Sequence, residues 1–171
     1  MEQFVRDARI AQIYEGTNGI QAMDLVGRKL GKDGGRALRT LFEVIGEDIA
    51  AAKAAGDPAG VGAALESAVG ELQRATMWLA QNGMADPDNA GAGAYSYMEL
   101  MGLVTLGWMW LKMVQVSAPH AANGSAERDF HEAKLVTARF YAERELPLAS
   151  GLRKQVEAGA ESIMKLPEEA F

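Results

Sequence analysis

The 171-residue chain contains no cysteine, which excludes disulfide bonds and thiolate metal ligands. It also lacks the patch of basic residues that a nucleic-acid interface requires, because 23 acidic residues outnumber 17 basic ones and the net charge is −6. The first seven residues, Met1–Asp7, lack the apolar core of a secretory signal peptide. We therefore expect no nucleic-acid partner, and we expect the protein to reside in the cytoplasm.

The sequence also lacks the alternating polar and apolar pattern of β-strands, and aromatic residues make up only 7% of it. What it has is 49% hydrophobic residues, many of them repeating at helical spacing. We predict an all-α protein with helices over residues 3–14, 19–30, 36–55, 58–83, 95–118 and 125–163, in which Pro147 breaks or kinks the last. We expect Asp57 to be the N-cap of the helix that follows it, with Pro58 in its first turn. We expect residues 86–94 to form a loop and a soft helix entry.

Residues 31–35, Gly-Lys-Asp-Gly-Gly, are the best candidate for a domain boundary. They divide the chain into residues 1–31, which carry two helices, and residues 36–171. The second part contains four helices joined by short loops, a pattern typical of an up-down four-helix bundle.

The segment 97–116 is nearly long and apolar enough to span a membrane. Glu99, Lys112 and Gln115 argue against that interpretation, because ionisable and polar groups are costly in hydrocarbon. We interpret the segment as a central bundle helix and expect no membrane partner. Trp108 and Trp110 would then face the core, or alternatively another subunit or domain.

The two histidines, His120 and His131, have no acidic or sulfur ligands at metal-binding spacing. We therefore interpret both as surface residues and predict no metal site.

The chain is organised around the connection between its first two helices, Tyr14-Glu15-Gly16-Thr17-Asn18-Gly19. Gly16 and Gly19 allow a sharp turn there, and Thr17 and Asn18 are good N-caps for the second helix. This arrangement places the Glu15 carboxylate on a short connection before the positive end of a helix. By spacing alone, a solvated carboxylate at an ordinary helix–turn–helix corner is the more common interpretation of Glu15.

The residues around this corner, Arg6-Asp-Ala-Arg-Ile10, Ile13-Tyr-Glu-Gly-Thr17 and Ile20-Gln21, closely resemble the C-terminal signature of the acyl-CoA dehydrogenases. The Asn18-Gly19 pair is similar to the longer members, including the 3-methylmercaptopropionyl-CoA dehydrogenase-like group, which carry an extra C-terminal helical domain. A weaker resemblance to that domain continues at Ala133-Lys-Leu135, Ala138-Arg-Phe-Tyr141, Leu146-Pro147 and Ala158-Gly-Ala-Glu-Ser162.

The resemblance implies a role for each residue of the corner. Glu15 would be the catalytic base that removes the α-proton of an acyl-CoA thioester. Gly16 would be the backbone position closest to the bound acyl-CoA. Thr17, Asn18 and Gly19 match the family positions that contact FAD.

The resemblance also implies that the chain is the C-terminal piece of a longer enzyme. The N-terminal helical domain and middle β-domain, which form most of the flavin and CoA site in this family, have no counterpart here. We expect FAD, acyl-CoA, an electron-transfer acceptor and homo-oligomerisation in the parent enzyme, and neither FAD binding nor activity in this chain alone. The alternative is a non-catalytic helical module for assembly, in which the motif is a relic.

Overall fold

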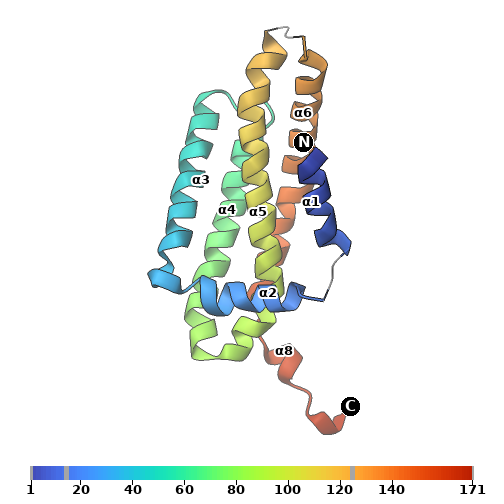
Figure 1. Ribbon diagram of the computed structural model, residues 1–171. Coiled ribbons are helices and arrows are strands. Elements are labelled where there is room, and N and C mark those ends of the chain that lie inside the picture. The colour runs from blue at the N-terminus through green and yellow to red at the C-terminus, as the bar shows by residue number, and fades with distance from the viewer. Residues whose placement is uncertain (1, 14–15, 124–125, 171) are drawn as a thin grey trace.

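The computed structural model describes residues 2–13, 16–123 and 126–170, and most of these residues are helical, with no strand among them (Figure 1). The predicted all-α class is therefore confirmed. The main helices are α1 (Glu2–Ile13), α2 (Asn18–Asp24), α3 (Arg36–Ala54), α4 (Val61–Trp78), α5 (Pro87–Ala122), α6 (Arg128–Phe140), α7 (Ala149–Glu157) and α8 (Glu161–Met164). Short π- or 3₁₀-helical turns join several of them: η1 (Leu25–Lys29), η2 (Lys32–Gly35), η3 (Leu79–Gly83), η4 (Tyr141–Glu145), η5 (Leu146–Leu148) and η6 (Glu168–Ala170).

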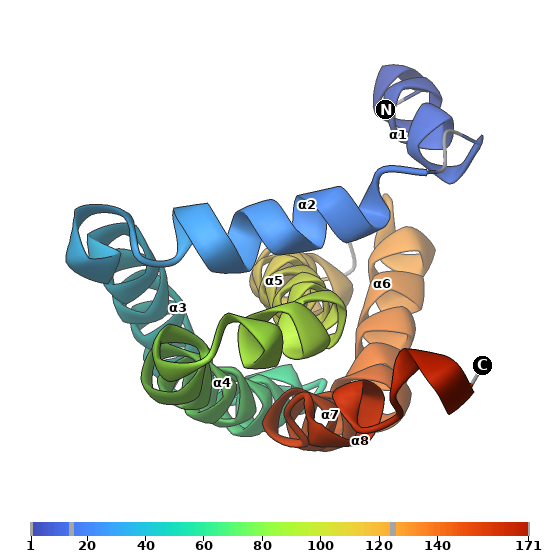
Figure 2. The same ribbon diagram turned by 90° about the horizontal axis from the view of Figure 1, so that it is seen from below.

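Helices α3, α4 and α5 run up and down beside one another, and α6 followed by α7 forms the fourth leg of the predicted up-down bundle (Figure 1, Figure 2). The break in this last leg falls at η4 and η5, and it includes Pro147 as predicted. A proline has no N–H to continue the helical hydrogen bonds and its ring crowds the preceding turn, so a short 3₁₀ turn redirects the chain into α7.

Helix α5 lies at the centre and contacts α2, α3, α4, α6 and α7. Its buried residues recur every three or four positions, which places them on one face. That face meets buried side chains from all other legs of the bundle: Ile45, Leu65, Leu72 and Val156. By length and composition α5 could cross a membrane, but here it is the core helix of the bundle, as interpreted from the sequence.

The loop part of the expectation for residues 86–94 is wrong, because α5 already begins at Pro87. The Asp86 carboxylate accepts a hydrogen bond from the backbone N–H of Asp88 at 3.0 Å, and Pro87 occupies the first turn, where its missing N–H costs nothing. Gly93 serves packing, since a Cβ there would lie 3.2 Å from a methyl of Val156. The small residues of this segment therefore allow α7 to approach α5 closely.

The connection between α3 and α4 differs in detail from the expectation. Asp57 is not the N-cap residue that the sequence predicted, but its carboxylate accepts hydrogen bonds from the backbone N–H groups of Gly62 and Ala63 in the first turn of α4, at 2.9 and 3.3 Å. It does so from four residues before the helix, with Gly60 in the N-cap position. Pro58 therefore lies in the connection and not in the first turn of α4.

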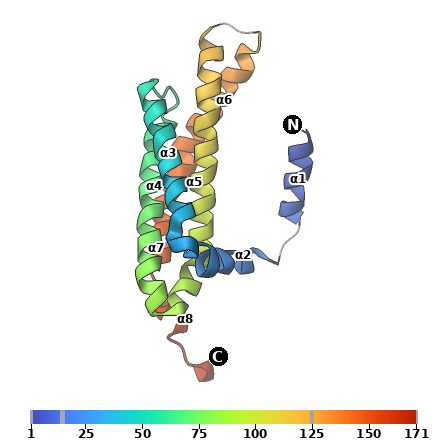
Figure 3. The ribbon, with the colours of Figure 1, turned by 60° about the vertical axis from the view of Figure 1, so that its left-hand side comes forward.

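The first two helices differ in how they meet the bundle. Helix α2 and η1 lie across one end of α5, and Ala22 is only 1% exposed (Figure 2). Helix α1 has no buried residue and stands apart from the bundle (Figure 3). The division of the chain into residues 1–31 and 36–171 stays a prediction.

Candidate functional site

The predicted site lies at the corner where the chain passes from α1 to α2 (Figure 3). Glu15, the predicted base, is outside the described residues. Gly16 has a φ of 117°, a conformation that glycine adopts without strain and that other residues avoid. Thr17 follows, and its carbonyl oxygen accepts the first hydrogen bond of α2 from the N–H of Gln21 at 2.9 Å.

The described part of this corner is open to the outside. Gly16, Asn18 and Gly19 are exposed and Thr17 is half-buried. No heavy atom of the described residues would lie within 4 Å of a Cβ on Gly16 or Gly19. Three surface grooves, of about 430, 390 and 300 Å³, are lined by other residues, between 42 and 157. The corner thus offers backbone and small polar groups, while the walls of a binding site would have to come from elsewhere.

Helix α2 fixes this corner to the bundle. Ala22 is buried, and Asp24 forms ion pairs with Arg28 at 2.6 Å and Lys29 at 3.1 Å. The hydrogen bond from Lys29, together with that from Arg28, lowers the pKa of Asp24. Thr17 was expected to cap α2, but its side chain makes no capping hydrogen bond. Its ψ of −4° is helical, whereas an N-cap residue is usually extended, which directs its side-chain oxygen toward the next turn.

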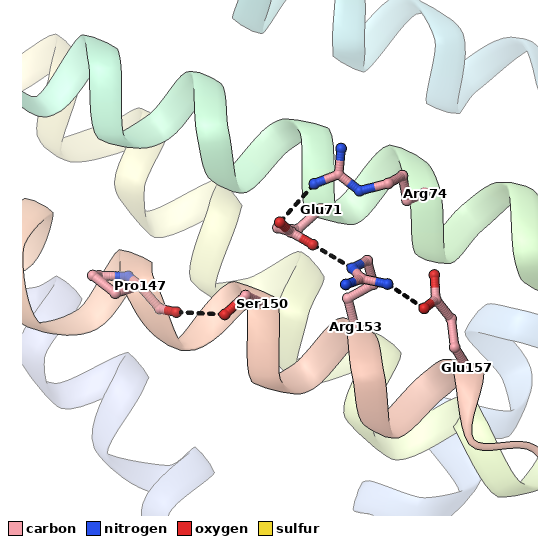
Figure 4. Close-up of polar contacts among 6 residues, drawn as sticks. All are labelled: Glu71, Arg74, Pro147, Ser150, Arg153 and Glu157. Carbon is pink, nitrogen blue, oxygen red and sulfur yellow. Dashed lines mark hydrogen bonds and ion pairs between the residues drawn. The ribbon is translucent and has the colours of Figure 1, made fainter.

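A network of four charged residues links α7 to α4, and it was not predicted from the sequence (Figure 4). Arg153 of α7 donates hydrogen bonds to Glu71 of α4 and to Glu157, and Arg74 donates to Glu71 at 2.6 Å. Burial raises the pKa of Glu71, but the hydrogen bonds from Arg153 and Arg74 outweigh it, so the pKa is lowered overall. Residues more than 80 apart in sequence cannot be matched by helical spacing, so no sequence signal pointed to this network.

A second polar cluster joins α3 to α5. The indole N–H of Trp108 donates to the Asp48 carboxylate at 2.6 Å, and the Lys112 ammonium pairs with the same oxygen at 2.8 Å. The hydrogen bond from Lys112 is the main reason why the pKa of Asp48 is lowered. Trp108 therefore has its polar partner inside the bundle. Trp110 packs beside Tyr141, with ring centroids 6.3 Å apart.

The interpretation of both histidines as surface residues is wrong for His131, which is 9% exposed. Its Nδ1 lies 3.2 Å from the hydroxyl oxygen of Ser117, and its ring stacks on exposed His120 at 4.7 Å. The helical register of α6 turns His131 toward α5, which the sequence did not reveal. Among the described residues, no group of three or more histidine, aspartate or glutamate side chains is placed to bind a metal ion.

The described residues form a helical domain, and the predicted site lies at an exposed corner between α1 and α2. A sequence model of the family described as Acetyl-CoA dehydrogenase C-terminal like matches residues 41–167. The chain belongs to this family and corresponds to the C-terminal part of an acyl-CoA dehydrogenase.

Similar curated proteins match over almost the whole chain. The broad-specificity linear acyl-CoA dehydrogenase FadE5 of Mycobacterium tuberculosis is 33% identical over all of this chain and 29% of its own length. The 3-methylmercaptopropionyl-CoA dehydrogenase of Ruegeria pomeroyi is 36% identical over 95% of this chain and 28% of its own length. The butyryl-CoA dehydrogenase of Syntrophomonas wolfei is 29% identical, again over 28% of its length. The chain therefore spans less than a third of these relatives.

Proposed function

We propose that the chain is the C-terminal portion of an FAD-dependent acyl-CoA dehydrogenase and that Glu15 is the base of its reaction. The observation that carries the proposal is the match of nearly the whole chain, including the corner at 15–19, to enzymes named for acyl-CoA dehydrogenation. The parent enzyme would act on an acyl-CoA, pass electrons to a separate acceptor and assemble as a homo-oligomer.

In the proposed reaction the Glu15 carboxylate takes the α-proton of the thioester, and a carbon–carbon double bond forms between the α- and β-carbons. FAD, when bound, accepts the hydride that leaves the β-carbon. A carboxylate removes a weakly acidic C–H proton only where burial raises its pKa and hydrogen bonds to the thioester oxygen stabilise the developing enolate. The described residues of the corner, 16–19, are exposed or half-buried, so under this proposal the rest of the enzyme covers the corner.

The small groups of the corner fit this role. Gly16 carries no side chain, and the open space around it would let an acyl-CoA approach the backbone closely. Thr17, Asn18 and Gly19 would supply a hydroxyl, an amide and backbone N–H groups to FAD. These contacts are few, and association costs several kcal/mol before any contact counts, so this chain alone should bind FAD too weakly to retain it.

The acyl group is selected elsewhere in the enzyme under this proposal. The three relatives are named for different acyl groups, yet each matches this chain over a similar 28–29% of its length. Because the three relatives share this C-terminal region but are named for different substrates, we expect the pocket that binds the acyl group to lie outside this region.

The test is Glu15→Gln in the full-length enzyme, because the amide has almost the same size but cannot accept a proton from carbon. Loss of a general base should slow the reaction by at least about 10²–10⁴-fold. The variant is mixed with acyl-CoA without oxygen while the flavin absorbance is followed. Glu47→Gln, which neutralises an exposed carboxylate on α3, is the matched control and should leave the rate unchanged.

Three outcomes separate the interpretations. A flavin that stays oxidised in Glu15→Gln, while substrate still perturbs its spectrum, supports Glu15 as the base with binding intact. Flavin bleaching at the unmodified rate shows that another residue is the base. A full-length protein that holds no flavin at all would favour the helical assembly module instead.

A further inference from the structure

Helix α5 has a second apolar face that no described element covers along most of its length. We call this face the open stripe, and its members recur every three to four residues or at multiples of that spacing: Tyr95, Gly102, Leu106, Met109, Met113 and Val116. The side chains of Leu106 and Val116 are 57% and 62% exposed. Apolar residues repeating at such intervals are typical of a helix seam that packs against another element.

The open stripe continues a surface that is already used for packing. Gly91 lies one helical turn before Tyr95 on the same face, and a Cβ on Gly91 would lie 3.9 Å from the side chain of Met23 on α2. Helix α2 therefore covers the beginning of this face and leaves the rest open. Figure 3 shows α1 standing on the same side, separated from α5.

Helix α1 has apolar side chains of its own without partners among the described residues. Phe4, Val5, Ile10 and Ile13 are 60–75% exposed. Phe4 and Val5 lie on one side of the helix and Ile10 and Ile13 on the other, as expected for a helix enclosed on two sides. At about 1.5 Å per residue, its 12 residues extend about 18 Å, whereas the stripe from 95 to 116 extends about 32 Å. α1 alone is too short to cover the stripe.

We propose that the open stripe is the surface on which the dehydrogenase part of the parent enzyme docks, and that this part also encloses α1. The proposal rests on the proposed function. The relatives carry more than two thirds of their length outside the region matched here, which is ample to supply such a partner. A second copy fits less well, because α1 and α2 stand on this side of α5 and obstruct a symmetric α5–α5 contact (Figure 3).

The natural absence of cysteine in this chain allows a direct test. Single substitutions Leu106→Cys and Val116→Cys place a thiol on the stripe. Met77→Cys on α4 and Val136→Cys on α6 are matched controls, since these side chains are 60% and 70% exposed away from it. The rate of thiol alkylation is read by mass spectrometry of the peptide, in this chain alone and in the full-length enzyme.

In this chain alone, all four thiols should react at similar rates at any protein concentration. In the full-length enzyme the two stripe thiols should react at least about tenfold more slowly than in this chain alone, because labelling then requires a transient separation of the surfaces. The control thiols should keep their rates.

Stripe thiols that react fast in the full-length enzyme overturn the proposal, as does equal slowing at the control positions. Slowing that appears in this chain alone and increases with concentration also overturns it, and identifies a second copy as the occupant. Flavin-dependent turnover is measured on the same samples. Fast labelling with normal turnover refutes the docking surface only, while slow labelling without turnover refutes the proposed function and leaves the docking surface.

Discussion

The closest packing around α5 can be tested with two glycine-to-alanine substitutions five residues apart in the same helix. Gly107 is buried where α4, α5 and η5 meet, and a Cβ there would lie 2.8 Å from a methyl of Leu146 and 3.2 Å from one of Leu65. Gly102 is exposed, and no heavy atom of the described residues would lie within 4 Å of its Cβ. The two sites therefore share a helix and differ in available space.

Alanine at Gly102 should raise the free energy of unfolding by about 0.5–1 kcal/mol, because glycine is the poorer helix former. Gly107→Ala gains the same helix propensity but forces Leu146 and Leu65 out of a filled core, which costs about 1–3 kcal/mol. Because the propensity term cancels, Gly107→Ala should be less stable than Gly102→Ala by about 1–3 kcal/mol.

Urea unfolding of this chain, followed by circular dichroism, gives both free energies from the same type of transition. The comparison needs equal m-values, which show that neither substitution changes the surface exposed on unfolding. Equal stabilisation by both alanines would refute the packing described for α4, α5 and η5.

Three further predictions concern caps, acid and flavin. Asp57→Ala removes the acceptor for the N–H groups of Gly62 and Ala63, and it should lower the free energy of unfolding, measured in urea, by about 0.5–2 kcal/mol. Asp57→Asn keeps a side-chain acceptor and should retain most of the stability that Asp57→Ala loses. The lowered pKa of Asp48 beside Lys112 contributes stability that is fully present above the ordinary Asp pKa of 3.8 and is lost as the pH falls through the lower folded value. Asp48→Asn should therefore flatten the loss of Tm as the pH falls below that ordinary pKa, and an unchanged slope would contradict the pairing. This chain, purified alone, should be colourless and leave the fluorescence of added FAD unchanged at micromolar protein, whereas a yellow protein with one flavin per chain would refute the need for the rest of the enzyme.

The local features of the chain were predictable because neighbouring residues decide them. The helical spacing of apolar residues predicted the all-α class. Pro147 predicted the break in the last leg of the bundle, because a proline has no N–H and disrupts the interior of a helix. The Asp57 side chain accepts a hydrogen bond from the first turn of α4, although Gly60 and not Asp57 holds the N-cap position that the Gly-Asp-Pro sequence indicated. The φ of 117° at Gly16 agrees with the turn predicted there, while the site roles of residues 15–19 stay a prediction.

Tertiary structure alone decided which contacts these helices make. Helix α5 is apolar on nearly all sides, so its periodicity could not show that one face enters the core while Leu106 and Val116 stay exposed. Residues 86–94 were expected to be partly a loop because glycines weaken a helix in isolation, whereas here Gly93 lets Val156 approach and the packing outweighs the propensity. His131 became buried for a similar reason, since the angle at which α6 meets α5 is set by the whole interface and not by the residues beside it.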